Sequence, residues 1–198
     1  MKRIITISRE FGSAGRTIGK KLAEKLGYAY YDKELVDNIA AETGFDPGYI
    51  EEHAEYSATA SRLSYFFSTP PTAGVMRGMS TADFLWCIQR EVILKIADEK
   101  PCVIVGRCAD YILRDRDDVF NVFVCAPIQV RADRIVRLYG ESEKKPEERL
   151  RDKDKRRANN YKHYTEREWG KADNYDLCLN TGKLDIDTCV ELIAGLVK

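Results

Sequence analysis

The stretch that decides the fold is residues 3–32, RIITISREFGSAGRTIGKKLAEKLGYAYYD. Residues 4–8 form a nearly continuous apolar run, which is typical of strands that are covered on both faces. A loop of small residues follows, and residues 17–26 then repeat apolar side chains at helical spacing. Residues 28–31, Tyr-Ala-Tyr-Tyr, are rich in aromatic side chains and predict a second strand. This order predicts a parallel sheet with a right-handed crossover.

Three further segments extend the pattern along the chain. Residues 102–105 and 119–125 are apolar and rich in β-branched or aromatic side chains, and residues 175–179 form a weaker run. Residues 128–138 show helical periodicity. Because strands and helices alternate, the sequence predicts an α/β fold built on a parallel sheet.

Two excursions interrupt this alternation. The first, residues 34–96, is longer than one crossover helix requires; its ends look helical, and residues 64–81 contain the Pro and Gly residues of a loop. The second, residues 139–174, is dominated by charged side chains. If both follow the carboxyl ends of strands, they lie at the edge where open α/β sheets bind ligands. We predict one domain of 198 residues, whose core is residues 1–33, 97–138 and 175–198.

Composition limits the classes of function. Lys plus Arg (32) balances Asp plus Glu (32), so the formal net charge is +0 and no overall field draws the chain to nucleic acid or membrane. We expect neither a signal peptide nor a membrane anchor, since no apolar run is long enough. Six scattered cysteines without a CxxC pair indicate buried, reduced thiols in a cytoplasmic protein. Because the net charge is zero, an anionic ligand must be bound by a local group of positive charges.

The loop after the first strand resembles a phosphate-binding loop. Compared with G-x-x-x-x-G-K-[ST], Gly15 fills the second glycine, Arg16 stands at the lysine and Thr17 at the hydroxyl that binds magnesium. Glu10 occupies the first glycine position, so the pattern departs at two places. Arginine keeps a positive charge and grips two phosphate oxygens with its planar fork. We therefore predict phosphate binding; the alternative is a glycine-containing turn in which Thr17 caps or packs the helix.

Other charged residues follow the predicted strands. Asp32 comes after the second strand, where it either orients a substrate or metal-bound water or caps the next helix. Arg107, beside Gly106, ends the third strand and is predicted to bind an anion, with a surface salt bridge as the alternative. Asp110 lies one helical turn further on. Arg90, in the first excursion, either points toward the cleft or is simply solvated.

In the second excursion, Arg149, Lys153 and Arg156 recur at i, i+4 and i+7 after Pro146, so one face of a helix carries three cations. Alternating acidic residues make a solvated helix with ion pairs the alternative. Phosphoryl transfer needs positive charge that closes over the transferring group and excludes water. Beside a phosphate loop, this pattern favours a mobile flap that carries arginines.

Together these segments resemble the cytidylate kinase-like family of P-loop proteins. The similarity runs through SREFGSAG and YYDKEL, then VIVGRCADYIL, FVCAP and RDKDKRR, and it covers nearly the whole chain. It implies a nucleoside monophosphate kinase fold of three layers around a five-stranded parallel sheet. Residues 34–96 would be a monophosphate-binding insertion, and residues 139–174 an arginine-rich lid.

The resemblance also implies ATP and Mg²⁺ as cofactors, with Thr17 as the metal ligand. The residues implied to hold the donor phosphates are Gly12, Ser13, Ala14, Gly15, Arg16 and Thr17. Those implied to bind the acceptor are Asp32, Arg90, Arg107, Asp110 and Arg151. The implied catalytic residues are Arg16, Arg149, Arg156 and Arg157, with Arg131, Arg134 and Arg151 as further candidates for lid and transition-state arginines.

The chain resembles well-characterised bacterial cytidylate kinases less closely than it resembles the kinase-like family. Those enzymes have D-G-R-D where this chain reads Val105-Gly106-Arg107-Cys108. We predict an ATP-dependent kinase of a nucleoside monophosphate, CMP or dCMP. Its expected partners are small nucleotides, with no nucleic acid and no membrane, and it is expected to be a monomer or homodimer. The alternatives are a nucleotide-binding regulatory protein with little activity and a kinase of another small acceptor.

Overall fold

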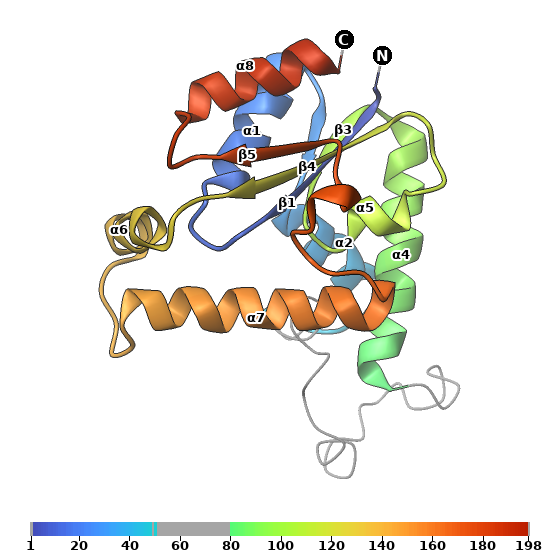
Figure 1. Ribbon diagram of the computed structural model, residues 1–198. Coiled ribbons are helices and arrows are strands. Elements are labelled where there is room, and N and C mark those ends of the chain that lie inside the picture. The colour runs from blue at the N-terminus through green and yellow to red at the C-terminus, as the bar shows by residue number, and fades with distance from the viewer. Residues whose placement is uncertain (1, 49, 51–79, 198) are drawn as a thin grey trace.

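The computed structural model describes residues 2–48, 50 and 80–197. Five parallel strands form one sheet in the order β2-β3-β1-β4-β5 (Figure 1). The strands are β1 (Ile4–Arg9), β2 (Ala29–Tyr31), β3 (Cys102–Val105), β4 (Val119–Cys125) and β5 (Leu177–Asn180). All four strand pairings are parallel, which confirms the predicted α/β fold with a five-stranded parallel sheet.

Helices connect the strands and cover both faces of the sheet. They are α1 (Gly15–Leu26), α2 (Lys33–Thr43), α4 (Thr81–Glu99), α5 (Ala109–Ile112), α6 (Ile128–Tyr139), α7 (Pro146–Thr165) and α8 (Ile186–Leu196), with a 3₁₀ turn at Ala172–Asn174. The helix expected after Pro146 from the spacing of its cations is α7, which begins at Pro146 itself.

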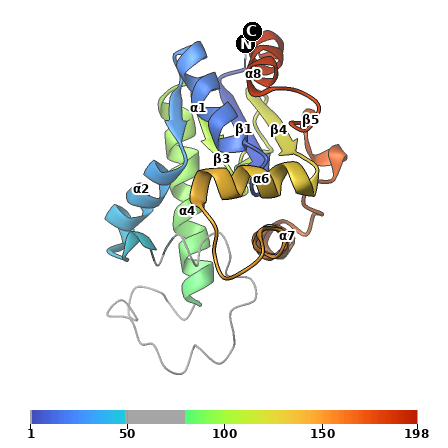
Figure 2. The ribbon, with the colours of Figure 1, turned by 90° about the vertical axis from the view of Figure 1, so that its left-hand side faces the viewer.

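The fold has three layers, with helices on both faces of the sheet (Figure 2), and an apolar core lies on each face. Ile5 and Ile7 of β1 pack with α1 and α8 on one face, whereas Ile4 packs with α2 and α4 on the other. This alternation follows from the two-residue period of a strand. Every residue of β1 is buried, as expected for the central strand of a parallel sheet covered on both faces.

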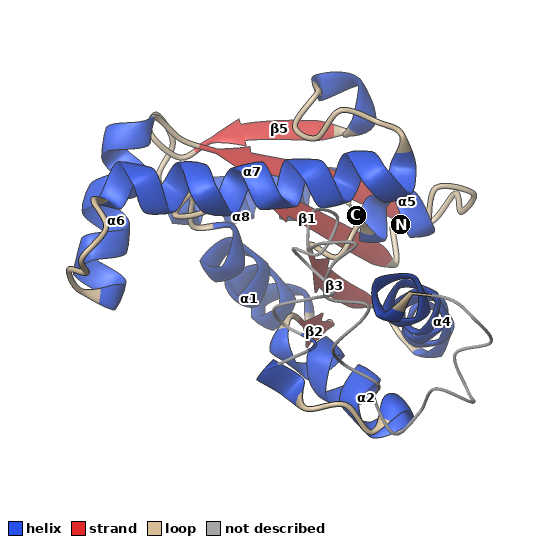
Figure 3. Cartoon of the chain, turned by 90° about the horizontal axis from the view of Figure 1, so that it is seen from below, coloured by secondary structure: helices blue, strands red, loops and turns tan. Residues whose placement is uncertain are grey.

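The two excursions form long helices beside the carboxyl ends of the strands. The first ends in α4, whose N-cap Ser80 accepts a hydrogen bond from the Asp83 N–H at 3.1 Å; most of the predicted loop 64–81 lies outside the described residues. The second forms α7, which crosses the sheet (Figure 3). At its C-terminal end, Tyr164 stacks on Trp86 of α4, with ring centroids 4.3 Å apart and planes 4° apart.

All six cysteines are free thiols. Cys102, Cys108 and Cys189 are buried as predicted, but the expectation is wrong for Cys178, which is exposed because it lies on the edge strand β5. Within the described ranges, no helix combines the length and apolar character needed to span a bilayer.

Candidate phosphoryl-transfer site

The predicted phosphate loop joins β1 to α1 and borders a pocket. Gly12 and Ala14 have φ of 78° and 69°, so the backbone turns sharply before α1 begins at Gly15. A Cβ on Gly15 would lie 2.5 Å from the Arg9 Cβ, which leaves room only for glycine. The first turn of a helix presents N–H groups and the positive end of the helix dipole, a combination that binds phosphate.

The carbonyl groups of the loop are held from the side of α6 and β5. Arg134 Nη1 donates to the Gly12 carbonyl at 2.7 Å, and Thr181 Oγ1 donates to the Ser13 carbonyl at 2.9 Å. Ser13 Oγ donates to the Glu10 carbonyl at 2.9 Å. These contacts fix the backbone before any ligand arrives, so the loop is preorganised.

Glu10, which replaces the first glycine of the pattern, has a structural role. Its carboxylate accepts a hydrogen bond from the Ala126 N–H at 3.0 Å and lies 3.4 Å from Arg131 Nε. Burial raises the pKa of Glu10, against the lowering effect of these two partners. Arg131 also pairs with Asp154, which accepts from the Phe11 N–H at 2.7 Å. Arg131 therefore braces the loop from behind and is absent from the pocket lining, contrary to its expected transition-state role.

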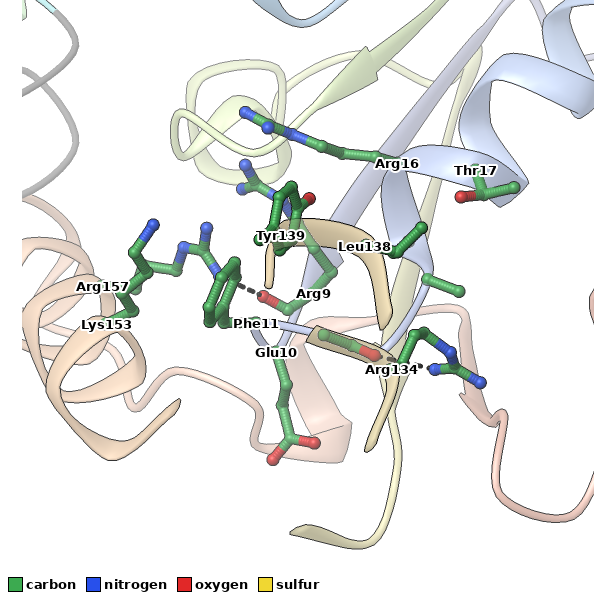
Figure 4. Close-up of a pocket in the computed structure, with 13 residues that line it drawn as sticks. Arg9, Glu10, Phe11, Arg16, Thr17, Arg134, Leu138, Tyr139, Lys153 and Arg157 are labelled. Carbon is green, nitrogen blue, oxygen red and sulfur yellow. Dashed lines mark hydrogen bonds between the residues drawn. The ribbon is translucent and has the colours of Figure 1, made fainter. Parts of the chain in front are cut away.

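The pocket beside the loop is cationic and partly aromatic (Figure 4). Phe11 stacks with Tyr139 at 6.0 Å, and Lys153 Nζ lies 4.3 Å from the Phe11 ring centroid. Glu10 is the one acidic side chain among the described residues that line it. The lining includes the predicted Gly12, Ala14, Gly15, Arg16 and Thr17, together with the cations Arg9, Arg134, Lys153 and Arg157.

Arg16 and Asp32 form an ion pair in which Arg16 Nε lies 2.8 Å from Asp32 Oδ2. Asp32 occupies the N-cap position of α2, but its side chain makes no capping hydrogen bond. Of the two interpretations from sequence, side-chain capping is therefore wrong. The carboxylate instead orients the guanidinium of the phosphate loop.

A second pocket lies between the ends of β1 and β3 and the inner face of α7. Its lining contains Arg9, Arg107 and Arg157, and no described residue of the lining is acidic. These three side chains are only 6, 6 and 8% exposed. Arg157 Nη1 lies 3.8 Å from Asp154 Oδ1, but Asp154 does not line the pocket. Three guanidinium groups around a described lining that has no acidic residue suit the binding of an anion.

Arg107 is held in this pocket by strained backbone. Gly106, Arg107 and Cys108 have φ of 76°, 58° and 53°, three consecutive left-handed residues. Gln89 Nε2 donates to the Arg107 carbonyl at 3.1 Å, whereas Arg107 Nη1 is buried without a hydrogen-bond partner. The surface salt bridge considered for Arg107 is therefore wrong. Strain and an unpaired buried donor are features of ligand sites.

Asp110 takes part in the architecture of the second pocket but does not line it. Its carboxylate accepts a hydrogen bond from the Tyr161 hydroxyl at 2.6 Å, and the Ser8 hydroxyl lies 3.5 Å away. Burial raises the pKa of Asp110, and burial together with this carboxylate raises the pKa of Tyr161. The pair fastens α7 to the start of α5, so Asp110 is a positioning residue.

Several predicted residues lie elsewhere: Arg90, Arg149, Arg151 and Arg156 line neither pocket. Arg90, Arg151 and Arg156 are exposed, and Arg149 donates to the Gly140 carbonyl at 3.0 Å. On α7 the buried residues include Leu150, Arg157 and Tyr161, which set the inward face. One residue is about 100° of rotation in a helix, so Arg156 points away while Arg157 points in.

Arg9 and Lys153 line the site but were not assigned to it from sequence. Lys153 belonged to the cationic face identified on the charged helix, and its spacing of four from Arg157 was the available signal. Arg9 directly follows the apolar run at residues 4–8, the same kind of signal that identified Arg107. The phosphate-loop pattern begins one residue later, at Glu10, so it does not include Arg9.

The model of a family described as the cytidylate kinase-like family matches residues 4–183. A cytidylate kinase from Archaeoglobus fulgidus is 28% identical over 201 residues, covering 98% of this chain and 94% of the relative. One from Natronomonas pharaonis is 26% identical over 196 residues, covering 98% and 89%.

Solved structures share the fold. An uncharacterized protein from Eubacterium ventriosum superposes with a TM-score of 0.72 at 28% identity, covering 98% of this chain and 97% of that one. A shikimate kinase from Acinetobacter baumannii gives a TM-score of 0.55 at 17% identity, covering 98% and 92%. The second likeness concerns the fold alone.

Proposed function

Because this chain belongs to the cytidylate kinase-like family, we propose that it transfers the γ-phosphoryl group of ATP, with Mg²⁺, to a nucleoside monophosphate, CMP or dCMP. Family and fold make it a kinase of nucleotides or small molecules. The observation that carries the finer proposal is a pair of cationic pockets that share Arg9 and Arg157. Phosphoryl transfer depends on positioning and on stabilising charge, and two adjoining cationic pockets suit both.

The pocket at the phosphate loop is the proposed donor site. Backbone N–H groups of the loop and Arg16 would hold the β and γ phosphates, and the aromatic side with Phe11 and Tyr139 gives the rest of a nucleotide an apolar surface. Division of the chain into a core, an acceptor insertion (34–96) and a lid (139–174) is part of this proposal.

Thr17 fits a magnesium ion that arrives with the nucleotide. It lines the pocket at the first turn of α1 and is exposed. The described part of the chain contains no group of three or more His, Cys, Asp or Glu able to hold a metal by themselves. Magnesium bound to phosphates needs only one or two protein ligands. When bound, the ion would neutralise charge on the phosphate oxygens.

The second pocket is the proposed acceptor site, and its chemistry favours a phosphate over a hydroxyl acceptor. A hydroxyl acceptor needs a base to take its proton, but the described lining contains neither a carboxylate nor a histidine. A phosphate monoester is mostly dianionic at neutral pH and needs no such base. Arg107, with a buried Nη1 that lacks a partner, would bind this dianion.

The test is ADP release from ATP and Mg²⁺ with a panel of acceptors: CMP, dCMP, UMP, AMP, shikimate and gluconate. We expect turnover with CMP or dCMP, and we expect Arg16→Ala to abolish it. Arg114→Ala is the matched control, because Arg114 is an exposed arginine that lines neither pocket. Turnover unaffected by Arg16→Ala would refute the donor site, and turnover of a hydroxyl acceptor alone would refute the acceptor class.

The regulatory alternative is separated by calorimetry on the same protein. If ATP and CMP bind but no CDP forms on long incubation, the chain is a nucleotide-binding protein without the proposed activity. This alternative is motivated by Arg16, which stands where the phosphate-loop pattern has lysine.

A further inference from the structure

We propose that Arg9 is a catalytic residue that contacts the phosphoryl group in transit between the donor and acceptor pockets. The inference rests on the proposed kinase function, and it assigns a role that the loop pattern does not contain. Arg9 is the last residue of the central strand β1. Its side chain lines both pockets and is 6% exposed.

Two glycines make room for the Arg9 side chain. A Cβ on Gly15, in the phosphate loop, would lie 2.5 Å from the Arg9 Cβ. A Cβ on Gly106, at the end of β3, would lie 1.8 Å from Arg9 Nη1. The arginine therefore crosses from the donor loop to the start of the Gly106–Cys108 bend, with its guanidinium above a residue that must be glycine.

The position of Arg9 differs from those of the other arginines. Arg16 lines only the donor pocket, and Arg107 only the acceptor pocket. Arg157 lines both pockets but belongs to α7, the proposed lid, whereas Arg9 belongs to the core of the sheet. Figure 4 shows the Arg9 side chain running from the loop toward the same open region as Arg16.

Charge at this position suits the transition state of the reaction. The transferred group carries charge on three equatorial oxygens midway between donor and acceptor. A guanidinium fixed by the sheet needs no reorganisation at that moment, which is the condition for strong electrostatic stabilisation. Arg9 therefore supplies a positive charge that is fixed by the sheet between the two sites, in a chain that has no lysine in the phosphate loop.

The first test compares Arg9→Met and Arg9→Lys with the wild-type protein. Removal of one fixed donor to a transition state lowers kcat about 10²- to 10³-fold, so we expect Arg9→Met to lose that factor. KM for ATP and for CMP should change much less, since the contact is made chiefly in the transition state. Arg9→Lys should recover part of kcat because it restores the charge.

A second variant tests the same contact without removing the charge. Gly106→Ala should displace the Arg9 guanidinium, because its Cβ would overlap Nη1. Gly27→Ala is the matched control: Gly27 also has positive φ, at 68°, but a Cβ there would meet nothing within 4 Å. Gly106→Ala should lower kcat, and adding it to Arg9→Met should lower kcat little further, since both changes remove one interaction.

The outcomes separate this inference from the proposed function. If the wild-type protein phosphorylates none of the acceptors, the proposed function fails and this inference fails with it. If it is active and Arg9→Met keeps its kcat, Arg9 has no catalytic role while the kinase stands. If thermal denaturation shows that Arg9→Met loses kcat because it unfolds, Gly106→Ala becomes the deciding variant. Full activity of Gly106→Ala would then overturn the proposal.

Discussion

Replacing Arg107 by methionine should stabilise the protein while weakening acceptor binding. The Arg107 side chain is 6% exposed and its Nη1 has no hydrogen-bond partner. A buried polar group left without a partner costs about 1–3 kcal/mol. Methionine keeps much of the apolar stem, and the Gln89 hydrogen bond goes to the Arg107 backbone carbonyl, so it survives. We expect the free energy of unfolding to rise by about 1 kcal/mol, which raises Tm by about 2–4 °C in a chain of this size.

The same substitution removes the proposed ligand of the acceptor phosphate. A hydrogen bond to a charged group is worth about 1.5–3 kcal/mol, which corresponds to about a 10- to 100-fold higher KM for CMP. KM for ATP should stay near its wild-type value, since Arg107 does not line the donor pocket. Stability and acceptor affinity should therefore change in opposite directions.

Two measurements decide the matter: urea unfolding of the ligand-free protein, and coupled ADP release with CMP as the varied substrate. Arg114→Met provides the control, since it removes the same charge from an exposed side chain that lies 4.2 Å from the Tyr111 ring centroid. A less stable Arg107→Met protein with an unchanged KM for CMP would mean that Arg107 is a structural residue, and the argument from its unpaired nitrogen would be refuted.

Two further predictions concern the supports of the site. Thr181→Val keeps the side-chain shape but removes the hydroxyl that donates to the Ser13 carbonyl at 2.9 Å. Loss of this hydrogen bond should destabilise the loop conformation by about 1 kcal/mol, so KM for ATP should rise severalfold in steady-state kinetics. An unchanged KM for ATP would contradict a role of Thr181 in holding the loop. Burial raises the pKa of Asp110 above its ordinary value of 3.8, so its contribution to stability is full below that pH and is lost as pH rises through the folded-state pKa. In Asp110→Asn the amide oxygen still accepts from Tyr161, so this variant should gain stability relative to the wild type as pH rises from about 4 toward neutrality. The measurement is urea unfolding of both proteins across that pH range. A difference in unfolding free energy that stays constant with pH would disprove a raised pKa for Asp110.

The sheet could be predicted because its strands are short apolar runs between polar segments. Residues 102–105 and 119–125 have the same bounds in the sequence prediction and in the structure. The weaker run predicted at residues 175–179 appears as β5 at Leu177–Asn180. It is the edge strand, where one side is open and the apolar pattern is correspondingly diluted.

The site was harder to predict because its geometry depends on tertiary contacts. Spacing alone grouped Arg149 with Arg156, but the inward face of α7 is set by the burial of Leu150 and Tyr161. The pairing of Arg16 with Asp32 joins two loops that only the sheet brings together. Arg9 follows an apolar run in the sequence, but the path of its side chain between the two pockets depends on Gly106, which is distant in sequence and leaves space for the guanidinium.

The stack of Trp86 on Tyr164 links the two excursions mechanically. One ring belongs to α4 and the other to α7, and they lie 4.3 Å apart in parallel planes. A rigid displacement of α7 must either separate these rings or carry the near end of α4 with it. The proposed lid and acceptor insertion thus share a pivot, and a movement that begins at one of them is transmitted to the other without passing through the sheet.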